Sequence, residues 1–370
     1  MKKKDRYVVI MAGGSGERFW PVSRKSQPKQ LIKLLSNRSL LQQTVDRVKP
    51  IFLLQNIIII TNASQLALVR KQLPDLPRGN IIGEPCGRDT CAAVALGIAL
   101  VRSRTDCGIM AILPADHIIT NKVKFRSVLL DSMCFASREK VLLTIGIKPE
   151  EPATGYGYIQ VKRRSRDNIS KSLKSTFFNV KKFIEKPSLV KAKRYLKSGD
   201  YRWNAGMFIW SCAAVEAEFK RQIPKLYAII DRWSSIRSLT KLNSVLCNEY
   251  PKLDKISIDY AIMENAKKII CADGVFGWDD LGSWPALSRH IRIDNSGNSS
   301  VADFVQIDSF NNVIFDARTF NRTPITLVGI NDSIVVQTDD ATMIAAKSES
   351  QKIKQLVAKL AKDKRFKHLV

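Results

Sequence analysis

The chain has 370 residues, and 45% of them are hydrophobic, so it can bury a substantial core and is long enough for two or three domains. No stretch approaches the roughly 20 apolar residues of a membrane span, and the run after the basic start is too short for a signal peptide, which predicts a cytoplasmic protein without a membrane partner. The formal net charge of +26 would suit a nucleic-acid-binding protein, but no zinc finger, recognition helix or aromatic-rich sheet motif accompanies it, so we interpret it as a surface charge that attracts anionic small substrates.

The first half of the chain alternates apolar runs with segments of helical periodicity. Strands separated by helices of this length form parallel βαβ units, so residues 1–147 predict a doubly wound, Rossmann-like α/β sheet. Ligands on such a sheet gather beyond the carboxyl ends of the strands. The strands are expected at 7–11, 57–61, 109–113 and 141–147, and the helices near 40–48, 64–72, 90–102 and 125–137.

A glycine-rich loop follows the first predicted strand directly. Gly13, Gly14 and Gly16 carry no Cβ, so backbone N–H groups can turn inward and approach a polyphosphate, and Arg18 and Lys29 add positive charge. The loop is not a P-loop, because no Gly-Lys-Ser/Thr follows the glycines. It is not a dinucleotide fingerprint either, because Arg18 stands where a third glycine is needed. The pattern therefore indicates a phosphate-binding loop, and the alternative is an ordinary strand-to-helix turn with a surface arginine.

Two further segments are expected to lie near this loop. Residues 84–89 and 114–117 follow strands of the same sheet, so they should converge with the loop on one crevice. Asp116 belongs to the second segment, and the pair Asp279 and Asp280 follows an apolar stretch far along the chain. Proteins hold Mg²⁺ beside a triphosphate with one or two carboxylates, completed by water and phosphate oxygens. Taken singly, each aspartate is more often a turn or helix cap than a metal ligand.

The middle region, about 148–290, mixes strands and helices and contains side chains suited to a sugar. Strands are expected at 156–160, 177–184 and 207–210, and a helix at 189–197. Carboxylates and amides, here Glu185 and Asn204, hydrogen-bond vicinal hydroxyls, and Lys186 can neutralise a phosphate. The glycines around Gly157 would let backbone close on a ring. A solvated charge pair at Glu185 and Lys186, and a plain turn at Gly157, are the alternatives.

After about residue 290 the pattern changes to short strands separated by turns. These strands, at 305–307, 313–315, 325–328 and 334–336, predict a small β domain resembling a few coils of a β-helix. An amphipathic helix with apolar residues at 353, 356, 357 and 360 closes it. We therefore expect a catalytic domain over 1–290, with a nucleotide half at 1–147 and a sugar half at 148–290, and a C-terminal β domain over 291–370.

In their order, these segments resemble the sugar nucleotidyltransferases, and most closely the bacterial mannose-1-phosphate guanylyltransferase family. The resemblance runs from about residue 7 to residue 362. The family often has Asn where this chain has Asp89, and Pro where it has Ala92. The segments that carry the resemblance most specifically are 13–30, 83–90, 113–117, 183–187, 204–208 and 278–284.

The resemblance implies roles for individual residues. The catalytic cations that stabilise the reacting phosphates would be Arg18 and Lys29. The residues that hold the rest of the nucleotide, from the phosphates to the guanine, would be Ala12, Gly13, Gly14, Ser15, Gly16, Glu84, Pro85, Arg88 and Asp89. The residues that hold the mannosyl hydroxyls and its phosphate would be Gly157, Glu185, Lys186 and Asn204. The Mg²⁺ ligands would be Asp116 and Asp280, although sequence alone does not separate Asp279 from Asp280.

The reaction implied is the conversion of GTP and mannose 1-phosphate to GDP-mannose and diphosphate by Mg²⁺-assisted in-line transfer. Three histidines, and seven cysteines without a C-x-x-C pair, leave little basis for imidazole chemistry, zinc or disulfides. The alternatives are another sugar 1-phosphate with UTP or dTTP and, from a different class, a basic nucleic-acid-binding protein. Because the chain ends soon after the closing helix, we expect transferase activity without isomerase activity. The apolar strands of the β domain would allow a homodimer.

Overall fold

The computed structural model describes residues 2–14, 16–164, 172–320 and 322–370. Contacts divide the chain into two compact units, and each is described by itself below. Unit 1 comprises Met1–Gly13, Thr44–Ala115 and Ile119–Trp278, and unit 2 comprises Gly14–Gln43, Asp116–Ile118 and Asp279–Val370. This grouping cuts the chain at other places than the expected division near residue 290, which stays a prediction.

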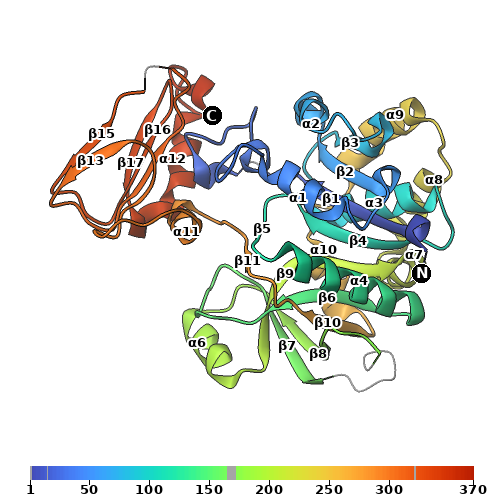
Figure 1. The fold of residues 1–370 in the computed structure, drawn as a ribbon. Coiled ribbons are helices and arrows are strands. Elements are labelled where there is room, and N and C mark those ends of the chain that lie inside the picture. The colour runs from blue at the N-terminus through green and yellow to red at the C-terminus, as the bar shows by residue number, and fades with distance from the viewer. Residues whose placement is uncertain (1, 15, 165–171, 321) are drawn as a thin grey trace. The chain divides into compact units, whose positions relative to one another are not determined.

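Unit 1 is built on one large sheet, whose described part has nine strands in the order β3-β2-β1-β4-β9-β6-β10-β8-β7 (Figure 1). The strands are β1 (Arg6–Ala12), β2 (Ile57–Asn62), β3 (Ile81–Glu84), β4 (Ile109–Pro114), β6 (Leu142–Ile147), β7 (Tyr158–Arg164), β8 (Phe177–Ile184), β9 (Tyr201–Ser211) and β10 (Ile269–Asp273). Two-residue strands also occur at β5 (Ile118–Ile119) and β11 (Trp278–Asp279).

The amino-terminal part of the sheet is parallel, as the alternation of strands and helices predicted. Strand β1 pairs in parallel with β2 on one side and β4 on the other, and β2 pairs in parallel with β3. Successive side chains such as Val8 and Val9 point to opposite faces, and both are fully buried. A strand buried on both faces reads as a continuous apolar run, which is why these strands stand out in the sequence.

The sheet is not parallel throughout, because β9 lies between β4 and β6 and pairs antiparallel with both. Beyond it, β10 pairs in parallel with β6 and antiparallel with β8. The α/β fold class is confirmed, and the sheet is a mixed one in which a strand from the middle of the chain completes the amino-terminal half. The order of strands in the sheet depends on pairing between distant segments, so the local periodicity of the sequence does not predict it.

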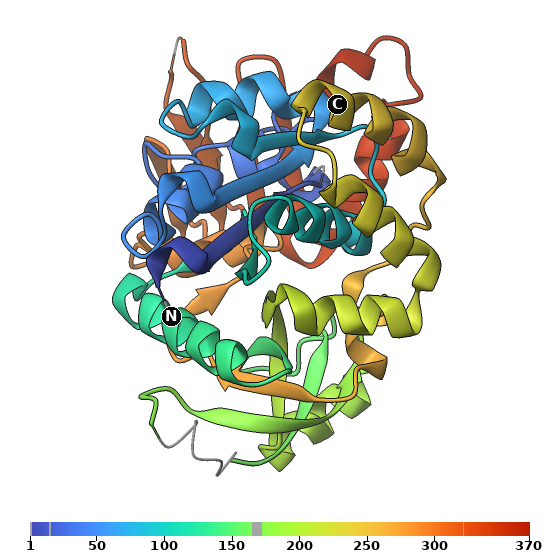
Figure 2. The ribbon, with the colours of Figure 1, turned by 90° about the vertical axis from the view of Figure 1, so that its right-hand side faces the viewer.

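Helices cover both faces of this sheet (Figure 2). The helices α3, α7 and α8 contact one another and contribute to one apolar cluster with β1 and β2, while α4 packs against β4, β6, β9 and β10. The helices α7 to α10 are additions to the predicted elements. The bounds are α1 (Leu40–Val48), α2 (Leu66–Gln72), α3 (Asp89–Arg102), α4 (Lys122–Arg138), α6 (Leu189–Ser198), α7 (Cys212–Gln222), α8 (Pro224–Ser234), α9 (Leu239–Glu249) and α10 (Ile258–Ala261).

Unit 2 contains a β-helix-like domain, which confirms that expectation. Strands β12, β14 and β16 stack in parallel on one face and β13 and β15 on another, and β17 pairs antiparallel with β16. The bounds are β12 (Ser299–Val301), β13 (Phe304–Ile307), β14 (Val313–Asp316), β15 (Ile325–Val328), β16 (Ser333–Gln337), β17 (Thr342–Ala346), α11 (Trp284–Leu287) and α12 (Ile353–Leu360).

The segment that carries the glycine loop packs on this domain within unit 2. Phe19 and Trp20 join Phe315 in one apolar cluster with α12. The indole of Trp20 donates a hydrogen bond to the backbone oxygen of Leu369 at 2.8 Å, and the indole of Trp284 donates to the backbone oxygen of Trp20 at 3.1 Å. The loop is therefore anchored by residues more than 260 positions away in the chain.

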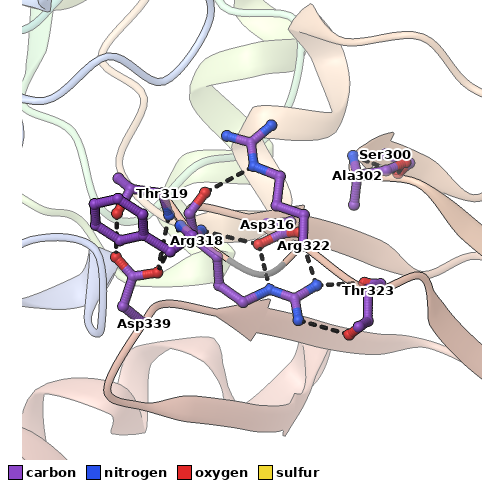
Figure 3. A network of polar contacts seen from close by, with 9 residues as sticks. Ser300, Ala302, Asp316, Arg318, Thr319, Arg322, Thr323 and Asp339 are labelled. Carbon is purple, nitrogen blue, oxygen red and sulfur yellow. Dashed lines mark hydrogen bonds and ion pairs between the residues drawn. The ribbon is translucent and has the colours of Figure 1, made fainter.

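A polar network around the buried side chain of Arg318 closes one corner of the β-helix (Figure 3). The guanidinium of Arg318 donates to both carboxylate oxygens of Asp316, at 3.0 and 2.9 Å, and to the hydroxyl of Thr323 at 2.8 Å. Arg322 donates from Nε to the backbone oxygen of Arg318 at 2.7 Å. Because the charge of Arg318 is matched and hydrogen-bonded, it can be buried in this corner.

Among the helices of the described residues, none combines the length and apolar character needed to cross a membrane.

Candidate active site

The glycine loop begins where β1 ends and passes from unit 1 into unit 2. Gly14 has φ +102° and Gly16 has φ +61°, conformations that favour glycine. A Cβ on Gly16 would also collide with Lys29, whereas one on Gly14 would meet nothing within 4 Å. Ser15, also expected in the phosphate loop, lies outside the described residues. The glycines thus serve a left-handed backbone at two positions and a close approach of Lys29 at one.

Lys29 lies at the centre of a group of charged residues in unit 2, which we call the Lys29 cluster: Arg18, Lys29, Asp116 and Asp280. The ammonium of Lys29 donates to a carboxylate oxygen of Asp116 at 2.8 Å and to the backbone oxygen of Asp280 at 2.6 Å. Arg18 donates to the backbone oxygen of Gly282 at 2.8 Å, and the position of a Cβ on Gly282 lies 3.2 Å from the Asp280 carboxylate and 3.4 Å from Arg18. Four residues predicted separately therefore come together.

The charges of this cluster keep the carboxyl of Asp116 ionised. Burial acts to raise its pKa, but the charges of Lys29 and His117 and the hydrogen bond from Lys29 outweigh burial and lower the pKa below its ordinary value. The side chain of Lys29 is only 7% exposed, whereas that of Asp116 is 34% exposed, so the ammonium is shielded from solvent and the carboxylate is half-buried.

Asp279 and Asp280 have different surroundings, which the sequence did not reveal. One carboxylate oxygen of Asp279 accepts from Arg289 at 2.7 Å and lies 2.8 Å from His290, and the other accepts from the backbone N–H of Leu281 at 2.8 Å. Burial raises the pKa of Asp279, but these hydrogen bonds outweigh it and lower the pKa to about 2. Asp279 thus fixes the turn, in which Leu281 has φ +46°, and Asp280 is the member beside Arg18 and Gly282.

The described residues contain no group of three or more His, Cys, Asp or Glu side chains placed to hold a metal ion. The Lys29 cluster instead offers two carboxylates, Asp116 and Asp280.

A second group of predicted residues lies at the carboxyl ends of the parallel strands in unit 1. Ala12 ends β1 and Glu84 ends β3, and the position of a Cβ on Gly13 is 3.7 Å from a carboxylate oxygen of Glu84. The hydroxyl of Tyr250 donates to the other oxygen of Glu84. Burial raises the pKa of Glu84 to about 7, although the Tyr250 hydrogen bond acts to lower it. No pattern in the sequence pointed to Tyr250, which is 166 residues away from Glu84.

The remaining residues expected at the base lie just after β3. Pro85 is half-buried, and the guanidinium of Arg88 donates to the backbone oxygen of Pro251. Asp89 begins α3 with φ +62°, a strained conformation for a residue with a side chain, and accepts from the backbone N–H of Thr90 at 2.7 Å. Backbone strain of this kind concentrates at functional sites.

The residues expected to bind the sugar form a third group, also in unit 1. A Cβ on Gly157 would lie 2.5 Å from a Glu185 oxygen and 3.5 Å from Cβ of Asn204, so a side chain at this position would displace the Glu185 carboxylate. Glu185 pairs with Lys186 at 3.0 Å, and this hydrogen bond raises the pKa of Lys186. Asn204 donates to Asp259 at 2.6 Å. Sequence reasoning missed Asp259, and the available signal was a single carboxylate within the apolar run 258–263.

Two family models match the chain. The first, described as Nucleotidyl transferase, covers residues 7–296, and the second, described as MannoseP isomerase/GMP-like beta-helix domain, covers residues 302–360. Together they reach from β1 into α12.

Individual relatives match over nearly the whole chain. The mannose-1-phosphate guanylyltransferase ManC of Salmonella typhimurium is 36% identical over all of this chain and 76% of its own length. The alginate biosynthesis protein AlgA of Pseudomonas syringae is 33% identical over 95% of this chain and 71% of its own. A crystal structure from Thermus thermophilus, described as a mannose-1-phosphate geranyltransferase, has a TM-score of 0.84 at 30% identity, covering 96% of this chain and 99% of that one.

Proposed function

The chain belongs to the nucleotidyl transferase family, as its motifs predicted, and on that premise we propose that it converts GTP and mannose 1-phosphate to GDP-mannose and diphosphate. The observation that carries the proposal is the likeness to a mannose-1-phosphate guanylyltransferase over the entire chain, β-helix domain included. The Lys29 cluster supports the reaction type, since it gathers the charged side chains that transfer between phosphates requires.

In this proposal the glycine loop, from Ala12 to Gly16, holds the GTP phosphates through backbone N–H groups. Arg18 and Lys29 neutralise charge on the reacting phosphates, and their placement supports this because both are fixed by hydrogen bonds to the turn at 280–282. Charged groups that are already held in place need not reorganise during the reaction. Such preorganised groups therefore stabilise the transition state most effectively.

The residues present also fit a magnesium ion. The donor set of Asp116 and Asp280 is two carboxylates, the hard oxygen ligands that Mg²⁺ prefers, and two such ligands leave positions for water and substrate phosphates. Asp279 is excluded as a ligand because Arg289, His290 and the backbone of Leu281 occupy its carboxylate. When bound, the ion would neutralise negative charge on the phosphates.

The two groups in unit 1 would bind the rest of the substrates. Glu84, Pro85, Arg88 and Asp89 would border the guanine. Gly157, Glu185 and Asn204 would hold the mannosyl hydroxyls, with the nearby ammonium of Lys186 directed to the sugar phosphate.

The chemistry needs no strong general base. An oxygen of the mannose 1-phosphate group, already anionic at neutral pH, forms a bond to the α-phosphorus of GTP, while the bond from that phosphorus to the bridging oxygen breaks and diphosphate leaves. Positioning and charge neutralisation then provide the acceleration. This matches a site whose titratable groups near the phosphates, Asp116 and Lys29, are an ion pair.

The test is a panel of GTP, UTP, dTTP, ATP and CTP against mannose, glucose and N-acetylglucosamine 1-phosphates, with diphosphate release as readout. We expect the highest kcat/KM for GTP with mannose 1-phosphate. A preference for another pair would keep the family and change the substrate. No diphosphate with any pair, together with steeply salt-dependent binding of DNA or RNA, would replace the proposal by the nucleic-acid alternative.

A further inference from the structure

The side-chain amide of Asn204 on β9 is oriented by the protein itself. Its Nδ2 donates to Asp259 at 2.6 Å, and its Oδ1 accepts from the backbone N–H of Gly206 at 3.1 Å and lies 3.3 Å from the hydroxyl of Thr144. A backbone N–H can only donate and an ionised carboxylate can only accept, so these two partners distinguish the oxygen of the amide from its nitrogen.

Asp259 reaches Asn204 from a different element. It belongs to the short helix α10, whose first backbone N–H, that of Ile258, donates to the hydroxyl of Thr90 on α3 at 2.9 Å. The carboxylate is half-buried and has Glu185 and Asp89 as charged neighbours, with Lys186 paired to Glu185. Among the described residues, the main groups that shift the pKa of Asp259 include no cation, and the side chain that donates a hydrogen bond to it is Asn204.

The inventory of the Asn204 amide limits what it can offer a ligand. One of its two N–H groups is taken by Asp259, and its oxygen faces Gly206. The contacts of the described residues leave the second N–H, a donor, for a ligand. Glu185, by contrast, is a carboxylate and offers acceptors.

We propose, resting on the proposed function, that Asp259 is a positioning residue of the sugar site, which holds Asn204 so that the amide presents an N–H and not its oxygen to the sugar. Asn204 then donates to a sugar hydroxyl oxygen, and Glu185 accepts from a hydroxyl. Two neighbouring hydroxyls of the sugar are thereby read with opposite polarity.

The positioning should depend on the charge of Asp259. Burial, with the charges of Glu185 and Asp89, raises its pKa to about 6, although the hydrogen bond from Asn204 acts to lower it. Below that pH the carboxyl becomes protonated and is a weaker acceptor for the amide. The sugar phosphate itself titrates in a similar pH range. The readout is therefore the KM of the variant divided by the KM of the parent at each pH, because the titration of the substrate affects both values equally.

The kinetic experiment uses the full chain and the sugar 1-phosphate that the parent protein turns over best. Asp259→Ala is expected to raise KM for the sugar phosphate about 10-fold, with KM for the nucleotide unchanged and kcat changed by less than about 3-fold. Asp259→Asn keeps an acceptor oxygen, so at pH 8 its KM for the sugar phosphate should lie much closer to that of the parent than the KM of Asp259→Ala does. At pH 5.5, where the parent carboxyl is protonated, the ratio of KM in Asp259→Asn to KM in the parent should fall towards one. Asp254→Ala, an exposed acid five residues earlier, is the matched control and should change nothing.

A double-mutant cycle separates positioning from direct contact. If Asp259 acts through Asn204, the penalty of Asp259→Ala disappears in an Asn204→Ala background. A penalty that persists there, an unchanged KM for the sugar phosphate in the single variant, or an equal rise in KM for the nucleotide would each overturn the proposal.

A measurement without turnover keeps this inference distinct from the proposed function. The side-chain amide resonance of Asn204, observed by ¹⁵N–¹H NMR of asparagine-labelled protein, should shift with a midpoint near pH 6 in the parent and lose that transition in Asp259→Asn. A resonance that does not titrate in the parent would overturn the positioning, even if the enzyme makes GDP-mannose. If the resonance titrates but no sugar phosphate reacts, the proposed function alone fails.

Discussion

Four carboxylates at or beside the candidate site, two in each unit, are held by different kinds of partner. In unit 1, Glu84 accepts from the hydroxyl of Tyr250 and Asp259 from the amide of Asn204, both neutral donors. Burial prevails, and it raises the pKa of Glu84 to about 7 and that of Asp259 to about 6. A neutral hydrogen bond does not compensate for the loss of water around a charge.

In unit 2 each carboxylate has a cation among its partners. Asp116 pairs with Lys29, and Asp279 pairs with Arg289 and also contacts His290. The pKa of each carboxyl is lowered although burial acts in the opposite direction. The carboxyls of Asp116 and Asp279 are therefore kept ionised, whereas the pKa values of Glu84 and Asp259, in the groups proposed to bind the base and the sugar, lie close to neutral pH. In the proposed function, the charged groups of unit 2 bind a cation and phosphates, whereas the groups of unit 1 recognise the base and the sugar by hydrogen bonds.

The largest effect is expected where a carboxylate of unit 2 is neutralised. Asp280→Asn keeps the backbone oxygen that Lys29 contacts, so the fold should persist, but turnover should fall about 10²–10³-fold, as for the loss of one preorganised electrostatic group. Asp116→Asn should lose as much turnover and some stability, because the buried ammonium of Lys29 loses its counter-charge. Initial rates of diphosphate release over a Mg²⁺ titration, with melting temperatures alongside, measure both. Undiminished release by Asp280→Asn would remove the metal assignment.

The neighbouring residue should behave in the opposite way. Asp279→Asn leaves Arg289 and His290 without their shared carboxylate, so the free energy of unfolding should fall by about 1.5–3 kcal/mol, the range for hydrogen bonds to charged groups. Turnover should fall less than in Asp280→Asn and in proportion to the disturbance of the turn. Urea denaturation of both variants checks this. If Asp280→Asn proves to be the destabilised one, the assignment of the two residues is reversed.

Stability should also depend on pH through Glu84. Its pKa in the folded protein, about 7, lies above the ordinary 4.5, so between these values the folded state binds more protons than the unfolded state. Stability from this group is therefore lost as pH rises through the window. Gln in place of Glu84 cannot titrate. In Glu84→Gln the decrease in the free energy of unfolding from pH 5 to pH 8 should therefore be smaller than in the parent by about 1–3 kcal/mol, measured by urea denaturation at both pH values.

Tyr250→Phe is the companion variant for Glu84. It removes the hydrogen bond that acts to lower the pKa of Glu84, so the loss of stability should become larger and extend to higher pH. Parallel pH profiles for the parent, Glu84→Gln and Tyr250→Phe would show that the buried carboxyl contributes nothing to the pH dependence.

Most of the elements could be predicted because they are local. The continuous apolar run of β1 and the heptad-like spacing of α12 were read directly from the sequence, and the structure has both. The place of β9 between β4 and β6 could not be predicted from the sequence, because it depends on pairing between segments about 60 to 100 residues apart.

The candidate site divides in the same way. Glycines at 13–16 and charged residues after strands are local signals, and they indicated the loop and the Lys29 cluster. The separation of Asp279 from Asp280 required the position of Arg289 and the conformation of Leu281. Tyr250 and Asp259 were missed because each acquires its role from a partner far along the chain, Glu84 and Asn204.

The smallest effects come from two ion pairs of unit 2 with the same geometry and different exposure. Arg318 binds both oxygens of Asp316, and Arg365 binds both oxygens of Asp363, each two residues away. The side chain of Arg318 is 9% exposed and that of Arg365 is 77% exposed. If a cation matters only where it is shielded from water, Arg318→Gln should lower the melting temperature by about 2–4 °C and Arg365→Gln by under about 1 °C. Differential scanning calorimetry measures both melting temperatures. Equal shifts would mean that a cation stabilises its carboxylate to the same extent whether or not the pair is buried. The contrast between the carboxylates of the two units would then come from the presence of a cation and not from its burial.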